Sequence, residues 1–336
     1  MPWRFLASRL LWACLVLVAI TVVTFVLTRM IPVDPARAAA GPDASAEAVE
    51  NLRHYMGLDR PLLAQYLSYM RDLLSLNFGR SIQTQQPVGE DLRALFPATL
   101  ELALVVTVVY TLLSVVLGVL AAVHHGSALD YALRTIALAG VGLPAFWVGM
   151  LLQAAFYKDL GWLPAAGRID PFVSLPTRIT GLYLVDSTVT GNWEALRSAA
   201  AHLVLPVVAV VLGRLAVGLK LTRIVMLEVL SEPYIRTARS KGLRGFVVIY
   251  KHGLRNALIP VVTTLGMQFS ALLGGTVIVE VVFAWPGIGR YAVGSIRTVD
   301  FPAIMSVTVV LAVAFLATNL LVDMLYVWLD PRIKYA

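Results

Sequence analysis

The stretch Tyr234–Pro260 reads YIRTARSKGLRGFVVIYKHGLRNALIP and lies between two long apolar runs. Between Arg214 and Arg255 the chain carries nine Lys and Arg residues against two acidic residues, Glu228 and Glu232, and this excess equals the whole formal net charge of +7. Because Lys and Arg resist translocation, positive charge beside apolar helices is typical of the cytoplasmic side of a membrane protein. The stretch therefore predicts a cytoplasmic loop, and its length and its Gly and Pro residues indicate a folded docking element.

Composition places the chain among membrane proteins. Of its 336 residues, 59% are hydrophobic and only 14% are charged, whereas soluble domains carry about 25% charged residues. The basic balance could also suggest a nucleic-acid partner, but its confinement to one loop favours membrane topology. The single cysteine, Cys14, lies in an apolar run, so a disulfide framework and a cysteine metal site are excluded.

Six apolar stretches are close to the roughly 20 residues that a helix needs to cross a bilayer. The first follows Arg4 and Arg9 and is longer than the core of a signal peptide, so we expect an uncleaved span with a cytoplasmic N-terminus. Six crossings return the C-terminus to the cytoplasm, in agreement with Arg332 and Lys334. The expected spans are Leu10–Thr28, Thr99–Val123, Ile136–Tyr157, His202–Leu221, Leu258–Phe283 and Ala303–Leu329.

The spans divide the chain into three regions: 1–30 with the first span, an external segment 31–97, and a core 98–336 with the other five spans. Apolar residues recur at helical spacing within 61–76, and a second helix-like stretch lies near 46–55. The core carries an external insert, 158–201, and the basic loop, 222–257. Within the core, Gly140, Gly142 and Pro144 in the third span, and Gly266, Gly274 and Gly275 in the fifth, predict kinks or close helix approach.

Polar residues inside the spans are candidates for a solute path, because such groups are costly at membrane depth and usually face the bundle or water. Asn319 and Asp323 lie four residues apart, hence on one helix face, and a structural bond to another helix is an equal alternative. Arg214 is a third candidate, unless it reaches out to the membrane surface. Glu101 and Glu280 are expected near the outer mouth, where solvation is easy.

Catalytic motifs are missing from the sequence. No Gly-Lys dipeptide exists, so a Walker A loop for ATP is absent, and HExxH, CxxC and GxSxG are also absent. We interpret His124 and His125 as a surface pair rather than metal ligands, and Ser198 near His202 as a helix cap rather than part of a hydrolase. An ion-coupled secondary transporter is an alternative, but it would show paired repeats and acidic residues at mid-membrane.

The basic loop resembles that of binding-protein-dependent ABC transporter permeases, in particular the peptide and nickel branch. Its opening Y-I-R-T-A-R-x-K-G-L and its closing H-x-L-R-N-A-x-x-P stand at 234–243 and 252–260. Matching signatures follow in order along nearly the whole chain, although Val33 and 77–79 depart from the usual pattern outside the membrane. They are Ile31-Pro32 with Asp34-Pro35, Gly57 to Pro61 before Gln65-Tyr66, Thr99 to Leu102, Glu280 with Phe283 to Arg290, and Asn319 to Asp323 before Asp330-Pro331-Arg332.

The insert, with Thr180-Gly181-Leu182, Asp186 and Gly191-Asn192-Trp193, is most similar to that of the first permease subunit of dipeptide importers. The resemblance implies an all-α, six-span permease of the type I ABC importer fold in the plasma (inner) membrane. It implies import of dipeptides or short peptides by alternating access, with nickel, glutathione or haem as alternative cargo. The implied partners are a second permease, two ATPase subunits that use ATP and Mg²⁺, and an external solute-binding protein. The chain itself would be no enzyme and would bind no cofactor.

The resemblance also assigns roles to residues. A short helix over about 234–240, stopped by Gly242, would dock into an ATPase groove, with Tyr234 and Ile235 as the buried contact and Arg236, Arg239 and Lys241 against an acidic rim. Arg255 and Asn256 would brace it against the fifth span, with Pro260 in that helix's first turn. The coupling set is Tyr234, Ile235, Arg236, Thr237, Ala238, Arg239, Lys241, Gly242, His252, Arg255, Asn256 and Pro260; the candidate external gate or receptor contact is Glu280, Trp285, Pro286, Gly287, Gly289 and Arg290.

Overall fold

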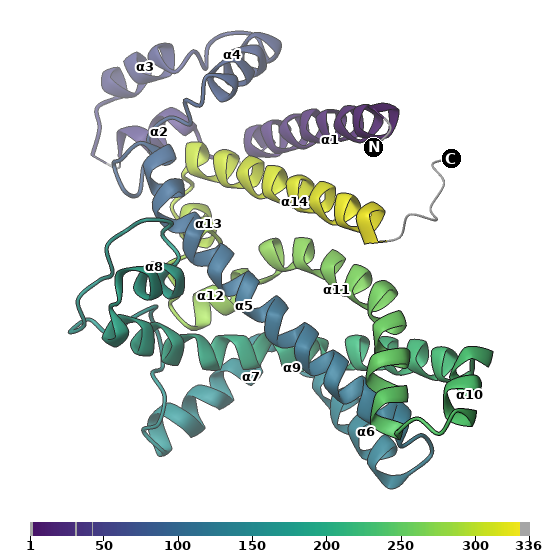
Figure 1. The fold of residues 1–336 in the computed structure, drawn as a ribbon. Coiled ribbons are helices and arrows are strands. Elements are labelled where there is room, and N and C mark those ends of the chain that lie inside the picture. Colours follow the sequence, from purple (N-terminus) through teal and green to yellow (C-terminus); the bar gives the residue numbers. More distant parts are fainter. Residues whose placement is uncertain (1–2, 31, 42, 330–336) are drawn as a thin grey trace. The chain divides into compact units, whose positions relative to one another are not determined.

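The computed structural model describes residues 3–30, 32–41 and 43–329 (Figure 1). Helices dominate these residues, no strand forms among them, and the prediction of an all-α chain is confirmed. Arg332 and Lys334, which suggested a cytoplasmic C-terminus, lie outside the described residues. The helices are α1 (Trp3–Met30), α2 (Pro35–Ala40), α3 (Ala46–Tyr55), α4 (Leu62–Leu74), α5 (Val88–Val123), α6 (Ala128–Val141), α7 (Ala145–Leu152), the π-helix η1 (Gln153–Asp159), α8 (Tyr183–Thr190), α9 (Trp193–Ser231), α10 (Pro233–Ser240), the π-helix η2 (Val247–Leu254), α11 (Arg255–Gly275), α12 (Val277–Val282), α13 (Ile288–Arg297) and α14 (Phe301–Leu329).

Within the described ranges, five helical segments are long and apolar enough to cross a bilayer, and a bent pair of helices can supply a sixth crossing. Several of these helices extend beyond the apolar stretches that predicted them. α5 begins at Val88 rather than Thr99, and α9 covers Trp193–Ser231 rather than 202–221. Segments of the expected external segment, insert and basic loop are therefore continuations of spanning helices.

The third expected span, Ile136–Tyr157, is not one helix. α6 ends at Val141, α7 begins at Ala145, and α6 meets the helix formed by α7 and η1 at 102°. Pro144 has an extended backbone there and no N–H to continue the α6 hydrogen bonds. A Cβ at Gly140 would lie 2.5 Å from the backbone oxygen of Leu212 in α9, so the predicted close approach and kink are both confirmed.

The fifth expected span, Leu258–Phe283, has the wrong bounds. The spanning helix runs over Val247–Gly275, because η2 continues into α11 without a break. Pro260 therefore lies inside the helix, not in its first turn, and its missing N–H interrupts the internal hydrogen bonds. Glu280 belongs to the separate helix α12 and is fully buried, so its expected solvation at an outer mouth is wrong.

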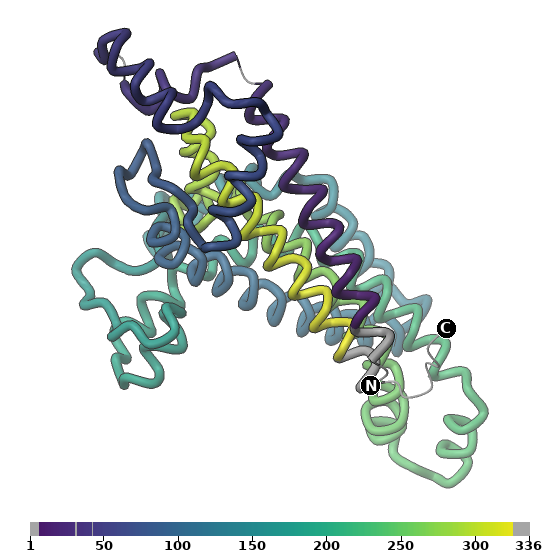
Figure 2. Tube along the Cα trace, turned by 90° about the horizontal axis from the view of Figure 1, so that it is seen from above, coloured from purple at the N-terminus to yellow at the C-terminus, as the bar shows by residue number. Residues whose placement is uncertain are grey.

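The chain forms two compact units. The first contains Met1–Thr99 and Pro286–Ala317; in it α1 and the first part of α14 run side by side (Figures 1 and 2). The helices expected near 46–55 and 61–76 are found as α3 and α4. The buried apolar core of this unit is formed by Val88, Leu92, Ile288, Tyr291, Ala303 and Val307.

Asp300 ties the first unit together and was missed by the sequence analysis. Its carboxylate accepts hydrogen bonds from the Ser81 hydroxyl at 2.5 Å, from the Gln83 N–H at 3.1 Å and from the Ala303 N–H at 3.2 Å. Ala303 lies in the first turn of α14, where the orphan N–H groups of a helix need acceptors. Asp300 is fully buried, and these hydrogen bonds join the loop before α5 to the start of α14.

The second unit contains Leu100–Trp285 and Thr318–Ala336 and is built around α9, which α6, α7, α8 and α11 contact. Small residues allow this packing. A Cβ at Gly218 would collide with Ser114, and a Cβ at Gly118 would collide with Thr222, so α5 and α9 approach closely at both points.

The insert 158–201, which was expected to be external, is fastened to α5 by a buried ion pair. Arg168 donates from Nε and Nη2 to Glu101 Oε2 at 2.9 and 2.7 Å, and its guanidinium stacks over the Tyr183 ring at 3.7 Å. The Leu184 N–H donates to the other Glu101 oxygen at 2.8 Å. Because the Glu101 and Arg168 side chains are only 3% and 6% exposed, the expectation that Glu101 is solvated is wrong.

Asp186 organises the rest of the insert. It is buried and accepts hydrogen bonds from the backbone of Ile179, Thr180 and Gly181 and from the Thr180 hydroxyl. Burial raises the pKa of this carboxyl, but the hydrogen bonds outweigh burial, and the net pKa lies below its usual value. Ser198 is not a helix cap as expected; it lies inside α9, where its hydroxyl accepts from the Asp170 N–H at 2.9 Å.

Candidate functional site: the basic segment between α9 and α11

The short helix expected over 234–240 is present as α10, which begins with Pro233 in its first turn. Gly242 has φ +74° and its N–H donates to the backbone oxygen of Arg239 at 2.9 Å. Only glycine adopts this left-handed conformation at little cost, so it ends the helix as expected. No atom lies within 4 Å of a Cβ built at Gly242, hence the requirement for glycine comes from the backbone conformation and not from crowding.

The faces of α10 differ from the expectation. Ile235 is fully buried and packs with Ala238 and Val248, beside Leu230. Its side chain has no surface left for another protein, so its assignment as a partner contact is wrong. The spacing of Ile235 and Ala238 by three residues places both on the inner face of the helix. The outer face is polar and exposed, and carries Arg236, Thr237, Arg239 and, beyond the helix, Lys241.

Asn256 braces α10 against the following helix. Its Nδ2 donates to the Tyr234 hydroxyl at 2.9 Å and to the backbone oxygen of His252 at 2.9 Å. The brace expected from Asn256 is therefore confirmed. Arg255 is exposed, His252 is partly buried, and Tyr234 keeps 41% of its surface exposed beside the cations of α10.

η2 packs closely on the end of α9. A Cβ at Gly253 would lie 3.2 Å from the Leu230 side chain and 3.6 Å from the Met226 side chain. On the outside of the same segment, the Phe246 and Tyr250 rings lie 4.5 Å apart, and Phe246 is 71% exposed. The sequence analysis did not single out this aromatic pair, although its spacing of four residues was the available signal.

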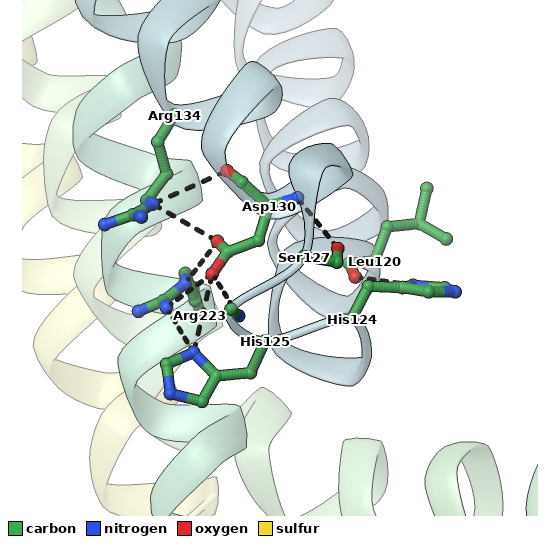
Figure 3. A network of polar contacts seen from close by, with 8 residues as sticks. Leu120, His124, His125, Ser127, Asp130, Arg134 and Arg223 are labelled. Carbon is green, nitrogen blue, oxygen red and sulfur yellow. Dashed lines mark hydrogen bonds and ion pairs between the residues drawn. The ribbon is translucent and has the colours of Figure 1, made fainter.

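A network around Asp130 fixes the neighbouring end of α6 to α9 (Figure 3). Arg223 donates to both carboxylate oxygens of the fully buried Asp130 at 2.8 Å. Arg134 Nε lies 3.2 Å from Asp130 Oδ1. His125 Nδ1 lies 2.7 Å from Arg223 Nη2 and 3.4 Å from Asp130. In the described part of the chain, no group of three His, Cys, Asp or Glu side chains could hold a metal ion.

The three polar candidates inside the spans occupy separate places in the second unit. Asn319 Oδ1 accepts from the Ser270 hydroxyl at 2.7 Å, which is a structural bond between α14 and α11. Arg214 is half-buried in α9, and a Cβ at Gly275 would lie 3.1 Å from its Nη2, so its guanidinium reaches the end of α11. Asp323 is partly buried one turn beyond Asn319.

The segment proposed for an external gate or receptor contact is mostly internal. Four residues of this set are buried, namely Glu280, Trp285, Gly287 and Gly289. Pro286 is partly buried, and only Arg290 of the set is exposed. Direct receptor contact by the four buried residues is therefore contradicted. The Trp285 N–H donates to the Glu280 backbone oxygen at 2.8 Å, and the intervening Ala284 has φ +47°, so this is a tightly turned loop.

Comparisons with known proteins find relatives over nearly the whole chain. Residues 114–335 match the family of binding-protein-dependent transport system inner membrane components, and residues 2–103 match the N-terminal region of membrane components of such systems. The chain is 44% identical to the probable D,D-dipeptide transport system permease protein of Escherichia coli strain K12, over 98% of this chain and 97% of that one.

Two further relatives carry different names. The chain is 42% identical to the dipeptide transport system permease protein of Alkalihalophilus pseudofirmus, over 97% of this chain and 98% of the relative. It is 37% identical to the glutathione transport system permease protein of Escherichia coli strain K12, over 99% of both chains.

Proposed function

The chain belongs to the binding-protein-dependent transport system inner membrane components, and from this we propose that it moves dipeptides or short peptides across the inner membrane by alternating access. It is a permease component of a peptide ABC importer, a multi-pass membrane protein and not an enzyme. The observation that supports peptide cargo is near-full-length identity of 39–44% to permeases named for dipeptide transport.

The proposed assembly contains a second homologous permease, two ATPase subunits that hydrolyse ATP with Mg²⁺, and an external solute-binding protein. The N- and C-termini and the basic segment face the cytoplasm. Closure of the ATPase pair would move α10, and the spans fastened to it would switch the path between inward-facing and outward-facing states.

The surface of α10 supports this role. Its inner face is packed on this chain through Ile235 and Ala238, so a force applied to the outer face is passed to η2 and α9. The outer face offers the cations of α10, and the exposed Phe246–Tyr250 pair offers apolar area nearby. A basic rim around an aromatic contact fits an acidic groove on a partner.

The proposal is tested by uptake into proteoliposomes that contain the full set of co-expressed subunits and the solute-binding protein. We expect ATP-dependent uptake of labelled L-Ala-L-Ala, with competition by other dipeptides. Uptake of D-Ala-D-Ala, glutathione and Ni²⁺ is measured in parallel, because each of them is the substrate expected under an alternative assignment. Uptake without ATPase subunits, driven by an ion gradient, would contradict the proposal and favour a secondary transporter.

Reversing a charge on the outer face of α10 tests docking directly. Arg236→Glu is expected to weaken co-purification of the ATPase subunit about tenfold or more, because like charges would meet across the interface. The readout is the amount of ATPase retained on the tagged permease. Arg197→Glu makes the same charge change at the exposed start of α9, on the expected external side, and should leave retention unchanged. Equal retention by both variants would reject the docking role.

A further inference from the structure

The first unit contains a cavity of about 230 Å³. It lies where the end of α1 meets α4 and the start of α14, and Phe25, Arg29, Gln65, Tyr69, Asp72 and Ser306 are among its lining residues. Six buried side-chain atoms in the described part of the chain have no hydrogen-bond partner, and three of them belong to this cavity: Arg29 Nε, Gln65 Oε1 and Tyr69 Oη. Because buried polar atoms are normally hydrogen-bonded, these three atoms offer hydrogen bonds to a ligand that enters the cavity.

The three atoms define the chemistry of that ligand. The Gln65 amide nitrogen donates to the backbone oxygens of Leu58 and Arg60 at 3.1 and 2.7 Å, which fixes Oε1 as an acceptor in need of a donor. Arg29 is a permanent cation whose Nε–H favours an anionic acceptor. Burial raises the pKa of Tyr69 to about 12, so its hydroxyl stays protonated and can donate. The ligand therefore carries both an anionic acceptor and a hydrogen-bond donor.

A second hollow continues from the cavity and has the opposite character. It is a groove of about 510 Å³ between α1, α4 and α14, and it shares Leu73 and Phe78 with the cavity. Its lining is almost entirely apolar and extends to Cys14 and Val313. Thr21 also lines it, but the Thr21 hydroxyl already contacts the Val18 oxygen and the Tyr66 hydroxyl. The groove offers no polar group to a ligand and suits a hydrocarbon chain.

The positions of the lining residues along α1 match the headgroup and hydrocarbon depths of a bilayer. A helix of 28 residues is about 42 Å long, close to the full thickness of a bilayer with its headgroup layers. Arg29 in the last turn then lies at headgroup level, and Cys14 lies about 22 Å along the helix from it, inside the roughly 30 Å hydrocarbon core.

We propose that the cavity and the groove together bind one glycerophospholipid with an ethanolamine headgroup. Its phosphate contacts Arg29 and Tyr69, its ammonium donates to Gln65 Oε1, and one acyl chain fills the groove along α1 and α14. Asp72 on the cavity wall favours an ammonium further. A choline headgroup has no donor for Gln65, so the site discriminates between the two zwitterionic lipids.

Native mass spectrometry of the full chain, purified in detergent with its co-expressed subunits, tests the proposal. After exchange into defined lipid, we expect retention of one phosphatidylethanolamine and about tenfold less phosphatidylcholine. Arg29→Gln should lower ethanolamine-lipid retention about tenfold, because a charge-assisted contact is lost. Arg71→Gln removes an exposed cation from α4 that lines neither hollow and should change nothing.

A second variant separates the headgroup contact from the chain contact. Ala314→Trp fills the groove while leaving Arg29 in place, and it should also abolish retention. Equal retention of both lipids, or equal behaviour of the Arg29 and Arg71 variants, would overturn the proposal. Displacement of the lipid by free glycerophosphoethanolamine or by a dipeptide at equal concentration would also overturn it, since the cavity would then bind a small polar solute without an acyl chain.

Discussion

Replacing Glu101 with alanine is expected to destabilise the protein by about 3–5 kcal/mol, the usual cost of leaving one member of a buried ion pair without its partner. Arg168 would be the uncompensated charge, with only 6% of its side chain exposed. The Leu184 N–H would lose its acceptor as well. The measurement is thermal or denaturant unfolding of the purified protein in detergent, with near-UV circular dichroism to follow the packing of the insert.

A double variant and an exposed pair serve as controls. Glu101→Leu with Arg168→Met removes both charges and should recover the part of the loss that comes from the uncompensated charge, since an apolar pair of similar volume is often as stable as a buried ion pair. Glu50→Ala breaks an exposed ion pair with Arg53. The Glu50 side chain is 53% exposed and the Arg53 side chain 39%, so the loss should cost less than about 1 kcal/mol of stability. Similar losses for Glu101→Ala and Glu50→Ala would mean that the insert is not held by this pair.

Replacing Gly242 with valine is expected to abolish ATP-driven uptake while the protein still inserts into the membrane. A β-branched residue at φ +74° is an outlier, and the left-handed conformation costs L-residues about 1–2 kcal/mol. The chain after Gly242 would relax to another path and carry the Phe246–Tyr250 pair away from its position beside the exposed cations of α10. The measurement is uptake together with ATP hydrolysis by the assembled importer; hydrolysis without uptake is the expected signature.

Gly245→Val is the matched control, because Gly245 is also exposed, has no atom within 4 Å of a Cβ and lacks the left-handed φ of Gly242. It should retain most of the uptake. Gly242→Asn should retain more uptake than Gly242→Val, since asparagine tolerates the left-handed region. Normal uptake by Gly242→Val would show that the turn after α10 is not needed for coupling.

Hydropathy predicted the approximate places of the spanning helices, because burial in lipid requires long apolar runs. It could not predict where those helices end in water. The first turns of α5, with Glu90 and Asp91, and the last turns of α9, with Glu228, continue the helix through polar sequence. Helix continuation there depends on packing, for example of Val88 and Leu92 in the core of the first unit.

Residue roles were predictable where local sequence decides them and not where distant segments meet. The left-handed turn at Gly242 and the kink at Pro144 follow from the conformational preferences of single residues. Asp130 and Arg223 lie 93 residues apart, and Glu101 and Arg168 lie 67 apart, so no local pattern joins them. Ile235 was assigned to the wrong side of α10 because only tertiary contacts decide which apolar residue a short helix buries.

Under the proposed function, the continuous helical segment from Val247 to Gly275, with Pro260 inside it, would act mechanically as a lever. Its 29 residues span about 40 Å, and its base is clamped to α10 by Asn256 and by the Ile235 contact. A tilt of about 10° at that base displaces the far end by roughly 7 Å, more than one helical turn of 5.4 Å. Under the proposed function, a small push at the basic segment would thus become a displacement the size of an amino-acid side chain at the other end of this helix.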